Sequence, residues 1–496
     1  MTVAPSRCII GTMPLKRTLG GWLSLLIFIA AAAAVSGQSE QPEQFPRSAI
    51  FDEAAYNSLP RKADLPARSY EGLPRSVSLK QYAPLPGNQE DYGTCVAWAS
   101  AYAARTISES VVLDRRSQTE STRNAFSPVY VYRSIQPNDR ELRRGAQIHW
   151  ALDLMRDSGA AKMLDIERTT DFRRIDVSSY SGSRKYPIAG YVTLFSRDDR
   201  YKPGIVTRTV KKSLAEGRPV IIGMNTPESF LEAKDVWRPT ESPDQFFGGH
   251  AMCVVGYSDD MHGGAFEILN SWGRKWGNGG FMWVPYQVFV DFVCESYEIS
   301  ENLSIYSAAV AFDGFARIDV LGMAAPRQAP LVFVPDGYYR IAESYAGGTR
   351  FRFAAGSRES AYMYVFAVLW PSGGDNFYNP ALLFPQTGVS ALLNYRDSAV
   401  VLPGEDKAFT LGGQAGTEYF VTLYAKQALD IQDIMRRFAS GKGAIGERLA
   451  GAVGKNLAAL AFSETEAAFT AQPDDPRAVA VLVIALDHPP NRQERP

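Results

Sequence analysis

The apolar residues of this chain change their spacing twice, and this limits the folds that the chain can adopt. Before about residue 220 they recur mainly at helical intervals, whereas from about residue 251 they form short β-rich runs separated by glycines. Helices followed by strands predict an α+β domain with a helical lobe and an antiparallel β lobe. We expect helices over residues 95–110, from Ser127 and Pro128 onward, and over residues 145–157 and 207–215. We expect strands over residues 219–224, 251–257, 265–269 and 280–284.

The second change begins near Val332, where strand-like runs predominate. The helical interval returns once, with an apolar stripe formed by Ile431, Ile434, Met435 and Phe438. We therefore predict a mainly-β, sandwich-like domain that carries a helical insertion. Its expected strands cover residues 349–353, 361–370, 408–411, 418–424 and 478–486.

The first part of the chain has the order of a secretory signal. Lys16 and Arg17 precede an uncharged apolar run of 14 residues from Trp22 to Val35, and small residues follow. This run is shorter than the roughly 20 residues that span a bilayer. We predict cleavage before Gln38 and export to a periplasmic, envelope-associated or secreted location, with no integral membrane span afterwards. An uncleaved anchor is the alternative.

Changes in composition and the positions of prolines and glycines divide the chain into six parts. A formal net charge of −1 gives no reason to expect a nucleic-acid partner. Prolines and polar residues after the signal indicate a leader or linker. The expected parts are a signal peptide (1–37), a polar leader (38–72), the two-lobed α+β domain (73–307), a linker (308–331), the mainly-β domain (332–489) and a polar tail (490–496).

The cysteine count indicates one reactive thiol. Removal of the signal would discard Cys8 and leave an odd number of cysteines, which in an exported protein suggests an unpaired thiol. The residues around Cys95 nominate it for that role. Cys253 and Cys294 would then either pair or remain as two buried thiols, and the sequence leaves both alternatives open. No histidines and cysteines have metal-site spacing, so we expect neither a metal nor a cofactor.

Cys95 lies where a loop rich in glycine and polar residues runs into a helix. The positive end of a helix dipole stabilises a thiolate, which is the nucleophilic form of cysteine. Gln89, six residues earlier, can donate its side-chain amide toward the same place. Together with the Cys95 N–H it would hold the oxyanion of a tetrahedral intermediate, a contribution of roughly 3 kcal/mol per donor.

A thiolate also needs an imidazole as its partner. His250 stands at the start of an apolar strand, and Asn270 follows another strand twenty residues later. An asparagine that accepts from the imidazole N–H would fix the tautomer and the direction of the ring. Trp272 would cover this hydrogen bond and keep water away from it. These roles require the sulfur and the ring to lie close together and to remain open to solvent.

Residues 89–98, 249–257 and 270–280 resemble the three sequence blocks of the papain-like cysteine peptidase family. The order Gln, Cys, His, Asn and the glycine-rich stretch after Asn-Ser-Trp agree with that family, over about residues 73–307. The resemblance implies a papain-like fold of two lobes, with a cleft between them that binds an extended peptide or protein substrate. By the same resemblance Cys95 is the nucleophile, His250 the acid and base, Asn270 the orienting residue and Gln89 the oxyanion donor.

The substrate contacts expected in this cleft involve Gly145, Ala146, Gly249 and Trp272. The sequence also departs from the family pattern. Tyr92 stands where many members have a disulfide-bonded cysteine, and Val96 replaces the usual tryptophan after the nucleophile. The leader is shorter than the usual inhibitory propeptide, so activation by removal of a long pro-region is not expected.

The expected function is hydrolysis of peptide bonds outside the cytoplasm through a thiolate–imidazole pair and an acyl-enzyme. In one alternative, the same triad serves a transpeptidase or an amidase. In another, the fold is a non-catalytic binding scaffold. The C-terminal domain weakly resembles a β-sandwich domain attached to bacterial envelope and signalling proteins. Its place beside a catalytic domain suggests an envelope or protein partner, by association alone.

Overall fold

The computed structural model describes most of the 496-residue chain. The described residues are 45–167, 171–178, 180–196, 198–199, 202–301, 312–322, 325–395, 398–412, 414–472 and 475–488. The predicted signal, the first residues of the leader and the polar tail lie outside them. None of the helices in these ranges combines the length and the apolar character that a membrane crossing requires.

The helical lobe begins with one long helical run. α2 (Cys95–Ala97), η3 (Trp98–Arg105) and α3 (Thr106–Val112) follow one another without a break, with η3 in π-helical geometry, and together they confirm the first predicted helix. The other helices of this lobe are α4 (Gln118–Arg123), α5 (Pro128–Ile135), α6 (Ile148–Asp157) and α7 (Met163–Ile166). Ser127 caps α5 as predicted, because its hydroxyl accepts from the N–H of Tyr130.

The predicted start of α6 at Gly145 is wrong. Gly145 has a φ of +73°, which belongs to the left-handed region, and the helix begins three residues later at Ile148. α8 (Pro203–Ala215) also differs from its predicted start at residue 207. Its first turn contains Pro203, a residue that fits there because the first helical N–H has no partner within the helix.

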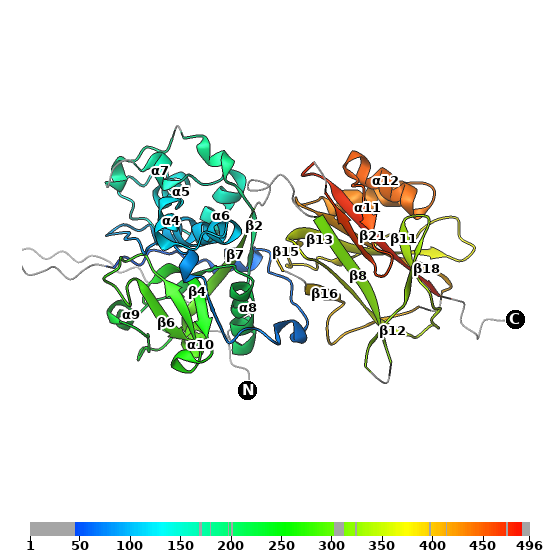
Figure 1. Cartoon of the computed structure of the whole chain (residues 1–496), viewed down its shortest axis with the longest axis horizontal. Helices are drawn as coiled ribbons and strands as arrows, with labels where there is room; N and C mark the ends of the chain where they lie inside the picture. The colour runs from blue at the N-terminus through cyan, green and yellow to red at the C-terminus, as the bar shows by residue number, and fades with distance from the viewer. Residues whose placement is uncertain are drawn as a thin grey trace, which may run out of the picture. The chain divides into compact units, whose positions relative to one another are not determined.

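An antiparallel sheet forms the second lobe, as predicted. Its order is β2-β7-β3-β4-β5-β6, with β1 paired to β4. The strands are β1 (Ser76–Ser78), β2 (Ile188–Thr193), β3 (Val220–Asn225), β4 (Gly249–Ser258), β5 (Ala265–Leu269), β6 (Phe281–Pro285) and β7 (Val293–Glu301). α9 (Glu228–Glu232) and α10 (Tyr286–Phe292) accompany them. In Figure 1, α4 to α7 form one group in cyan, and β4 and β6 form a second in green with α9 and α10.

Two further sheets form the C-terminal domain, in the orders β10-β11-β21-β18-β13-β14 and β16-β12-β8-β20-β19. Side chains alternate along β13: Met363 and Val365 join a core shared with strands of the other sheet, whereas Tyr364 and Phe366 join a core on the opposite face. The predicted sandwich-like arrangement is therefore confirmed. The strands are β8 (Phe312–Leu321), β10 (Leu331–Val334), β11 (Tyr338–Ile341), β12 (Arg350–Ser357), β13 (Ala361–Pro371), β14 (Ala381–Phe384), β16 (Ser398–Leu402), β18 (Gly416–Ala425), β19 (Ala461–Phe462), β20 (Ala468–Ala471) and β21 (Val479–His488).

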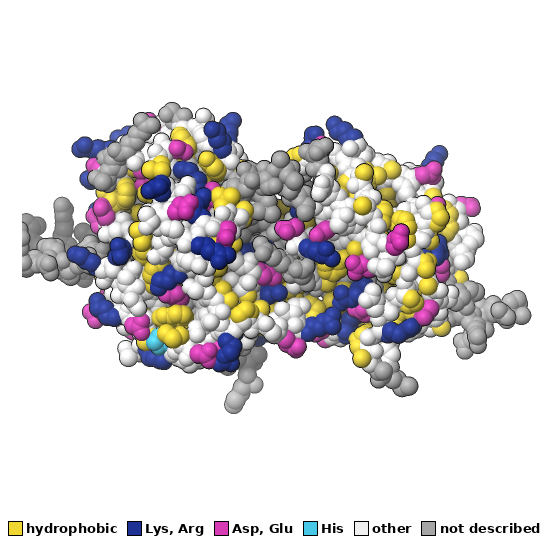
Figure 2. All heavy atoms as spheres, in the orientation of Figure 1, with side chains coloured by type: hydrophobic (Ala, Val, Ile, Leu, Met, Phe, Trp, Pro, Cys, Tyr) yellow, Lys and Arg dark blue, Asp and Glu magenta, His cyan; other side chains and the backbone are white. Residues whose placement is uncertain are grey.

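The helical insertion consists of α11 (Ile431–Ser440) and α12 (Ile445–Val453), which lie together in Figure 1. The predicted apolar stripe of α11 is buried in the core on the outer face of β13, where Phe438 meets Phe366 with ring centroids 5.6 Å apart. On the face drawn in Figure 2, basic and acidic side chains are interspersed, in keeping with the balanced charge of the sequence.

The stretch 308–331, which the sequence assigns to a linker, contains a full strand of the C-terminal domain. β8 pairs with β12 from Phe315 to Leu321. Every second residue at its start is buried, but these include Gly314 and Ala316. Such small residues leave little apolar alternation for sequence analysis to detect.

The leader is part of the folded body from residue 45 onward. After α1 (Glu53–Ser58), the N–H of Lys62 donates to Thr193 O at 2.8 Å, and the N–H of Arg61 donates to Gly388 O at 2.9 Å. The side chain of Lys62 is buried, and its Nζ lies 2.9 and 2.7 Å from the two carboxylate oxygens of Glu298. The assignment of residues 38–72 as a polar leader did not anticipate these contacts.

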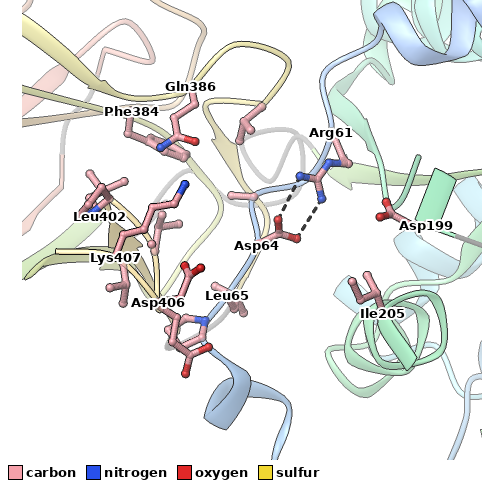
Figure 3. A pocket seen from close by; sticks show the side chains of 18 of the residues that line it. Arg61, Asp64, Leu65, Asp199, Ile205, Phe384, Gln386, Leu402, Asp406 and Lys407 are labelled. Carbon is pink, nitrogen blue, oxygen red and sulfur yellow. Dashed lines mark hydrogen bonds and ion pairs between the residues drawn. The ribbon is translucent and has the colours of Figure 1, made fainter. Parts of the chain in front are cut away.

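A cavity of about 420 Å³ adjoins this stretch (Figure 3). Arg61 and Asp64, which form an ion pair, line it together with Asp199 and Lys407. None of the predicted catalytic residues lines it, so it is distinct from the candidate site.

Lys62→Met is expected to lower the free energy of unfolding by about 3–5 kcal/mol, because the buried Glu298 carboxylate loses the cation that donates to it and keeps only the more distant charge of Arg218, whose Nε lies 3.9 Å from Oε1. Urea denaturation measures this loss. Arg61→Met is the matched control, since the Arg61–Asp64 pair is more exposed and should be worth less than about 1 kcal/mol. Equal losses in the two variants would show that the buried pair has no special weight.

Candidate active site

His250 and Asn270 come together because their strands are neighbours. His250 lies at the start of β4, and Asn270 follows the end of β5, which pairs antiparallel to β4. Asn270 Oδ1 lies 2.7 Å from His250 Nε2 and also accepts from the N–H of Ser271 at 2.7 Å. Since a carbonyl oxygen only accepts, Nε2 carries the hydrogen, and the neutral ring has its lone pair on Nδ1. His250 Nδ1 is buried and has no hydrogen-bond partner among the described residues.

Trp272 covers the imidazole. The two rings stack with centroids 4.3 Å apart and an interplanar angle of 25°. Trp272 is itself buried, and Phe230 and Trp276 contact it edge-on. The indole therefore fixes the ring plane of His250 and excludes water from the bond to Asn270.

Gln89 is tied to the loop that follows Asn270. Its N–H donates to Ser271 O at 2.8 Å, and its side-chain Oε1 accepts from the Ser271 hydroxyl at 2.6 Å. One hydrogen of Nε2 goes to Tyr92 O at 2.8 Å. These bonds bring the loop before Cys95 against the loop after Asn270. Because Asn270 also bonds to His250 on β4, three segments that are distant in the sequence meet at one place.

Cys95 is the first residue of α2, at the positive end of the long helical run. Its thiol lies against the backbone of Ala251, the residue next to His250, which lowers its pKa. Burial has the larger effect and raises the pKa of the Cys95 thiol. Both Cys95 and His250 have a relative exposure of 0%. The expected access to solvent is therefore absent in this structure.

Residues 45–51, here called the covering segment, account for this burial. Ser48 Oγ lies 3.6 Å from Cys95 Sγ. The N–H of Ala49 donates to Gly249 O at 2.9 Å, and the N–H of Ile50 donates to Ala146 O at 2.9 Å. In return the N–H of Ala146 donates to Ser48 O at 3.3 Å. The segment thus lies extended over the thiol, in parallel pairing with Ala146.

Glycines make room for this segment. A Cβ added at Gly145 would lie 2.0 Å from Ser48 O, and one added at Gly249 would lie 2.2 Å from Ala49 O. Three of the four predicted substrate contacts, Gly145, Ala146 and Gly249, therefore lie along an extended chain. The fourth, Trp272, contacts the same segment through Phe45, with ring centroids 4.8 Å apart.

Sequence analysis missed the covering segment itself. Its only signal was the apolar residues Phe45, Ile50 and Phe51 within an otherwise polar leader. The expectation that no long pro-region is removed did not consider that a short one could suffice, and here seven residues lie over the thiol. The question about Cys253 is also answered, because it is a free thiol and does not pair with Cys294.

Burial lowers the pKa of His250 to about 4, the bond to Asn270 opposes this, and the charge of Arg47 lowers it further. A depressed pKa means that the covered state disfavours the imidazolium. Stability of the covered state is therefore present above the ordinary pKa of 6.5 and is lost as the pH falls toward 4, by up to about 3 kcal/mol.

Ring-proton NMR of the four histidines is expected to show His250 titrating near pH 4 in the intact chain. After removal of the covering segment its midpoint should rise above 6, because solvent returns and Arg47 leaves. His250→Gln assigns the resonance, and His262, which lies away from Cys95, is the internal control. A midpoint near 6.5 in the intact chain would contradict the burial argument.

Comparison with known proteins supports a family for part of the chain. Residues 181–303 match the model of the papain family cysteine proteases, a range that includes His250 and Asn270 but not Cys95. An uncharacterized peptidase C1-like protein of Acanthamoeba polyphaga mimivirus is 26% identical over 220 residues, which cover 41% of this chain and 65% of the viral protein. A gut-specific cysteine proteinase of Caenorhabditis elegans is 28% identical over 101 residues, covering 19% and 30% respectively. The chain thus matches less than two thirds of either relative.

Solved structures of cysteine proteases are also similar to this chain. Xylellain, a cysteine protease from Xylella fastidiosa, is 20% identical, with a TM-score of 0.41, and the match covers 52% of this chain and 98% of xylellain. Procathepsin B S9 from Trypanosoma congolense is 14% identical, with a TM-score of 0.41, and the match covers 52% and 87%. Over residues 181–303, which hold His250 and Asn270, this chain is therefore similar to the papain family of cysteine proteases.

Proposed function

We propose that this protein is a cysteine-type peptidase that cleaves peptide bonds through a covalent acyl-enzyme. One observation carries the proposal. His250, which pairs with Asn270 under Trp272, precedes Ala251, whose backbone contacts the thiol at the helix start, and all lie in a groove that already holds an extended chain. Acyl transfer by a thiol needs these parts.

In the proposed reaction His250 Nδ1 takes the proton of Cys95, and the thiolate attacks the scissile carbonyl carbon. The C–N bond breaks as the imidazolium gives its proton to the leaving amine, and a thioester remains. Water then loses a proton to Nδ1, attacks the thioester and restores the thiol. The Cys95 N–H and the second hydrogen of Gln89 Nε2 donate to the oxyanion.

The two ends of the groove have different roles in this reaction. The part of a substrate that follows the scissile bond is here called the leaving segment, and the part before it the acyl segment. Because the imidazole protonates the leaving amine, the leaving segment runs past His250 and Trp272. The acyl segment then pairs with Ala146. The covering segment runs the opposite way, since Phe45 lies on Trp272 and Ile50 pairs with Ala146. In the covering segment, the peptide bond at Ser48 therefore has its N–H where a substrate would have its carbonyl. Since no carbonyl carbon faces the thiolate in the productive direction, the segment is not cut.

Export and a partner for the C-terminal domain belong to the same proposal. The charged, apolar and small-residue order of residues 1–37 supports export to the periplasm, the envelope or the medium. The C-terminal domain would hold the peptidase at an envelope or protein partner. Cell fractionation of the full chain tests export, and fractionation after removal of residues 312–489, which include β8, tests the role of the C-terminal domain.

The test of the function uses a chain that is opened after folding. A recognition sequence for a site-specific serine protease is inserted after Asp52, which is exposed, and the folded chain is cut and freed of its leader. This product is called the processed chain. Mass spectrometry of an unfolded protein digested by it should show new peptide ends. Failure to cleave any substrate would sink the proposal.

The same thioester could react with an amine in place of water, which would make the enzyme a transferase. Adding a primary amine to the digest distinguishes the two. Hydrolysis leaves free carboxylates, whereas transfer leaves amide-linked products whose share rises with the amine concentration.

A further inference from the structure

We propose that Glu228 and the carbonyl of Thr226 form a subsite that selects arginine or lysine among the first two residues of the leaving segment of a substrate. This specificity rests on the peptidase function proposed above. The acidic group is at the start of α9, on the side of the groove where the leaving amine departs.

The covering segment places a basic side chain in this subsite. Arg47 Nη2 lies 2.7 Å from Glu228 Oε1, and Arg47 Nη1 donates to Thr226 O at 2.9 Å. The Arg47 side chain is 21% exposed, whereas Glu228 is 71% exposed. The guanidinium thus bridges a carboxylate and a carbonyl, and both groups can only accept hydrogen bonds.

The floor of the subsite is backbone. A Cβ added at Gly248 would lie 3.2 Å from Arg47 Cβ and 3.3 Å from its Cδ and Nε, so the stem of Arg47 runs along this glycine. The N–H and the hydroxyl of Thr226 both donate to Gly248 O, at 2.9 and 3.1 Å. Asn225 Oδ1 accepts from the N–H of Phe247 at 2.8 Å. The subsite is therefore held in place without any ligand.

The position of the subsite relative to the thiol follows from the contacts of the residues on either side of Arg47. The next residue, Ser48, lies at the sulfur, and Phe45 lies on Trp272. The charge of Arg47 reaches the imidazole, because it contributes to the lowered pKa of His250. A cation in this subsite is thus one or two residues from the scissile bond, and Glu228 balances its charge next to the imidazolium.

The chemistry of the lining gives the direction of the preference. An acidic side chain would meet a carboxylate and a carbonyl, with no donor to pair with, and would be rejected. A neutral side chain would leave both acceptors to water. Since Glu228 is largely exposed, a basic side chain should bind only about two- to fivefold better than alanine at low salt, and less well as salt screens the pair.

The binding test separates this inference from catalysis. The processed chain carrying Cys95→Ala is titrated with fluorescent peptides that have Arg, Ala or Glu at the first or second leaving-side position. We expect Kd to rise in that order for at least one position. Glu228→Gln should remove the preference, and Glu228→Lys should favour Glu over Arg. Glu232→Gln, an exposed acid at the other end of α9, is the matched control and should change nothing.

A second arm uses the intact chain and needs no substrate. Arg47→Ala and Glu228→Gln should each speed the labelling of Cys95 by iodoacetamide several-fold, and the double variant should label no faster than Arg47→Ala alone, which already loses both contacts. Additive effects, or equal Kd values for Arg and Ala peptides, would overturn the subsite. A binding preference without any cleavage would support the subsite and refute the proposed peptidase function. Cleavage without any preference would support the peptidase function and refute the subsite.

Discussion

Cys95→Ala in the processed chain is expected to lower kcat for peptide hydrolysis by at least about 10⁴-fold, because no other group can form the thioester. Hydrolysis of internally quenched peptides measures the loss. Peptide mapping should also show that the adduct of a thiol-directed epoxide on Cys95 is lost, with Cys294 mapped separately because it is partly exposed. Cys253 should stay unlabelled, since it is fully buried and burial raises the pKa of its thiol well above the usual range.

Cys253→Ala is the matched control for this result. Cys253 lies on β4, the strand that also holds His250, so the control removes a buried thiol from the same strand. It should keep full activity apart from a small loss of stability. Cleavage by the Cys95→Ala variant at more than a few per cent of the normal rate would reassign the nucleophile.

Removal of the covering segment is expected to raise the rate of Cys95 labelling by iodoacetamide by about 100-fold or more. Three backbone hydrogen bonds hold the segment beside Cys95, through Ala49, Ile50 and Ala146. If each bond contributes about 1 kcal/mol, the segment is closed for most of the time and the open fraction is below about one per cent. Only the open fraction reacts, so the labelling rate of the intact chain reports the opening.

The uncut chain with the same insertion is the control for this comparison. Phe45→Ala in the intact chain should give an intermediate rate, because it loses only the stacking on Trp272. Mass spectrometry must show that the leader has gone after cutting. Equal labelling rates before and after its removal would mean that some other part of the chain buries the thiol.

The elements around the candidate site were readable from the sequence because each follows a local rule. A loop that ends at Cys95 gives way to an alanine-rich helix, and His250 and Asn270 lie at the ends of apolar strands between glycines. The order of residues along the chain does not, however, give the distance between them in space. The bond between His250 and Asn270 depends on the pairing of β4 with β5, and the sequence suggested it from the residue types and from a resemblance, without a measure of distance.

Sequence analysis missed three strands of the first sheet, β1, β2 and β7, and the reason is clearest for β7. β7 is buried along most of its length but carries Glu295, Glu298 and Ser300. Its polar groups are satisfied by residues distant in the sequence, since Lys62 pairs with Glu298 and Asn394 also donates to that carboxylate. A buried strand with distant polar partners shows no apolar period. β2, at the edge of the sheet beside β7, was missed as well.

The covering segment was harder still to foresee. Its contacts with Gly249 and Ala146 are made by backbone groups, which every residue except proline possesses. Their formation depends on the groove and hardly on the sequence of the segment. The side chains of Phe45, Arg47 and Ser48 add contacts of their own, and of these three Arg47 pairs with a charged side chain, that of Glu228, 181 positions away.

Ala146 offers its N–H to Ser48 and its carbonyl to Ile50, so a single residue of the groove holds a bound strand by both of its amide groups. Parallel and antiparallel partners can satisfy these two groups equally, because they differ only in which of their residues supply the complement. The two bonds to Ala146 therefore do not fix the direction of a bound chain, although that direction decides whether the chain persists or is cut. Retro-inverso peptides, built from D residues in reversed order, keep the side-chain arrangement of a resident ligand and are a natural starting point for inhibitors of this groove.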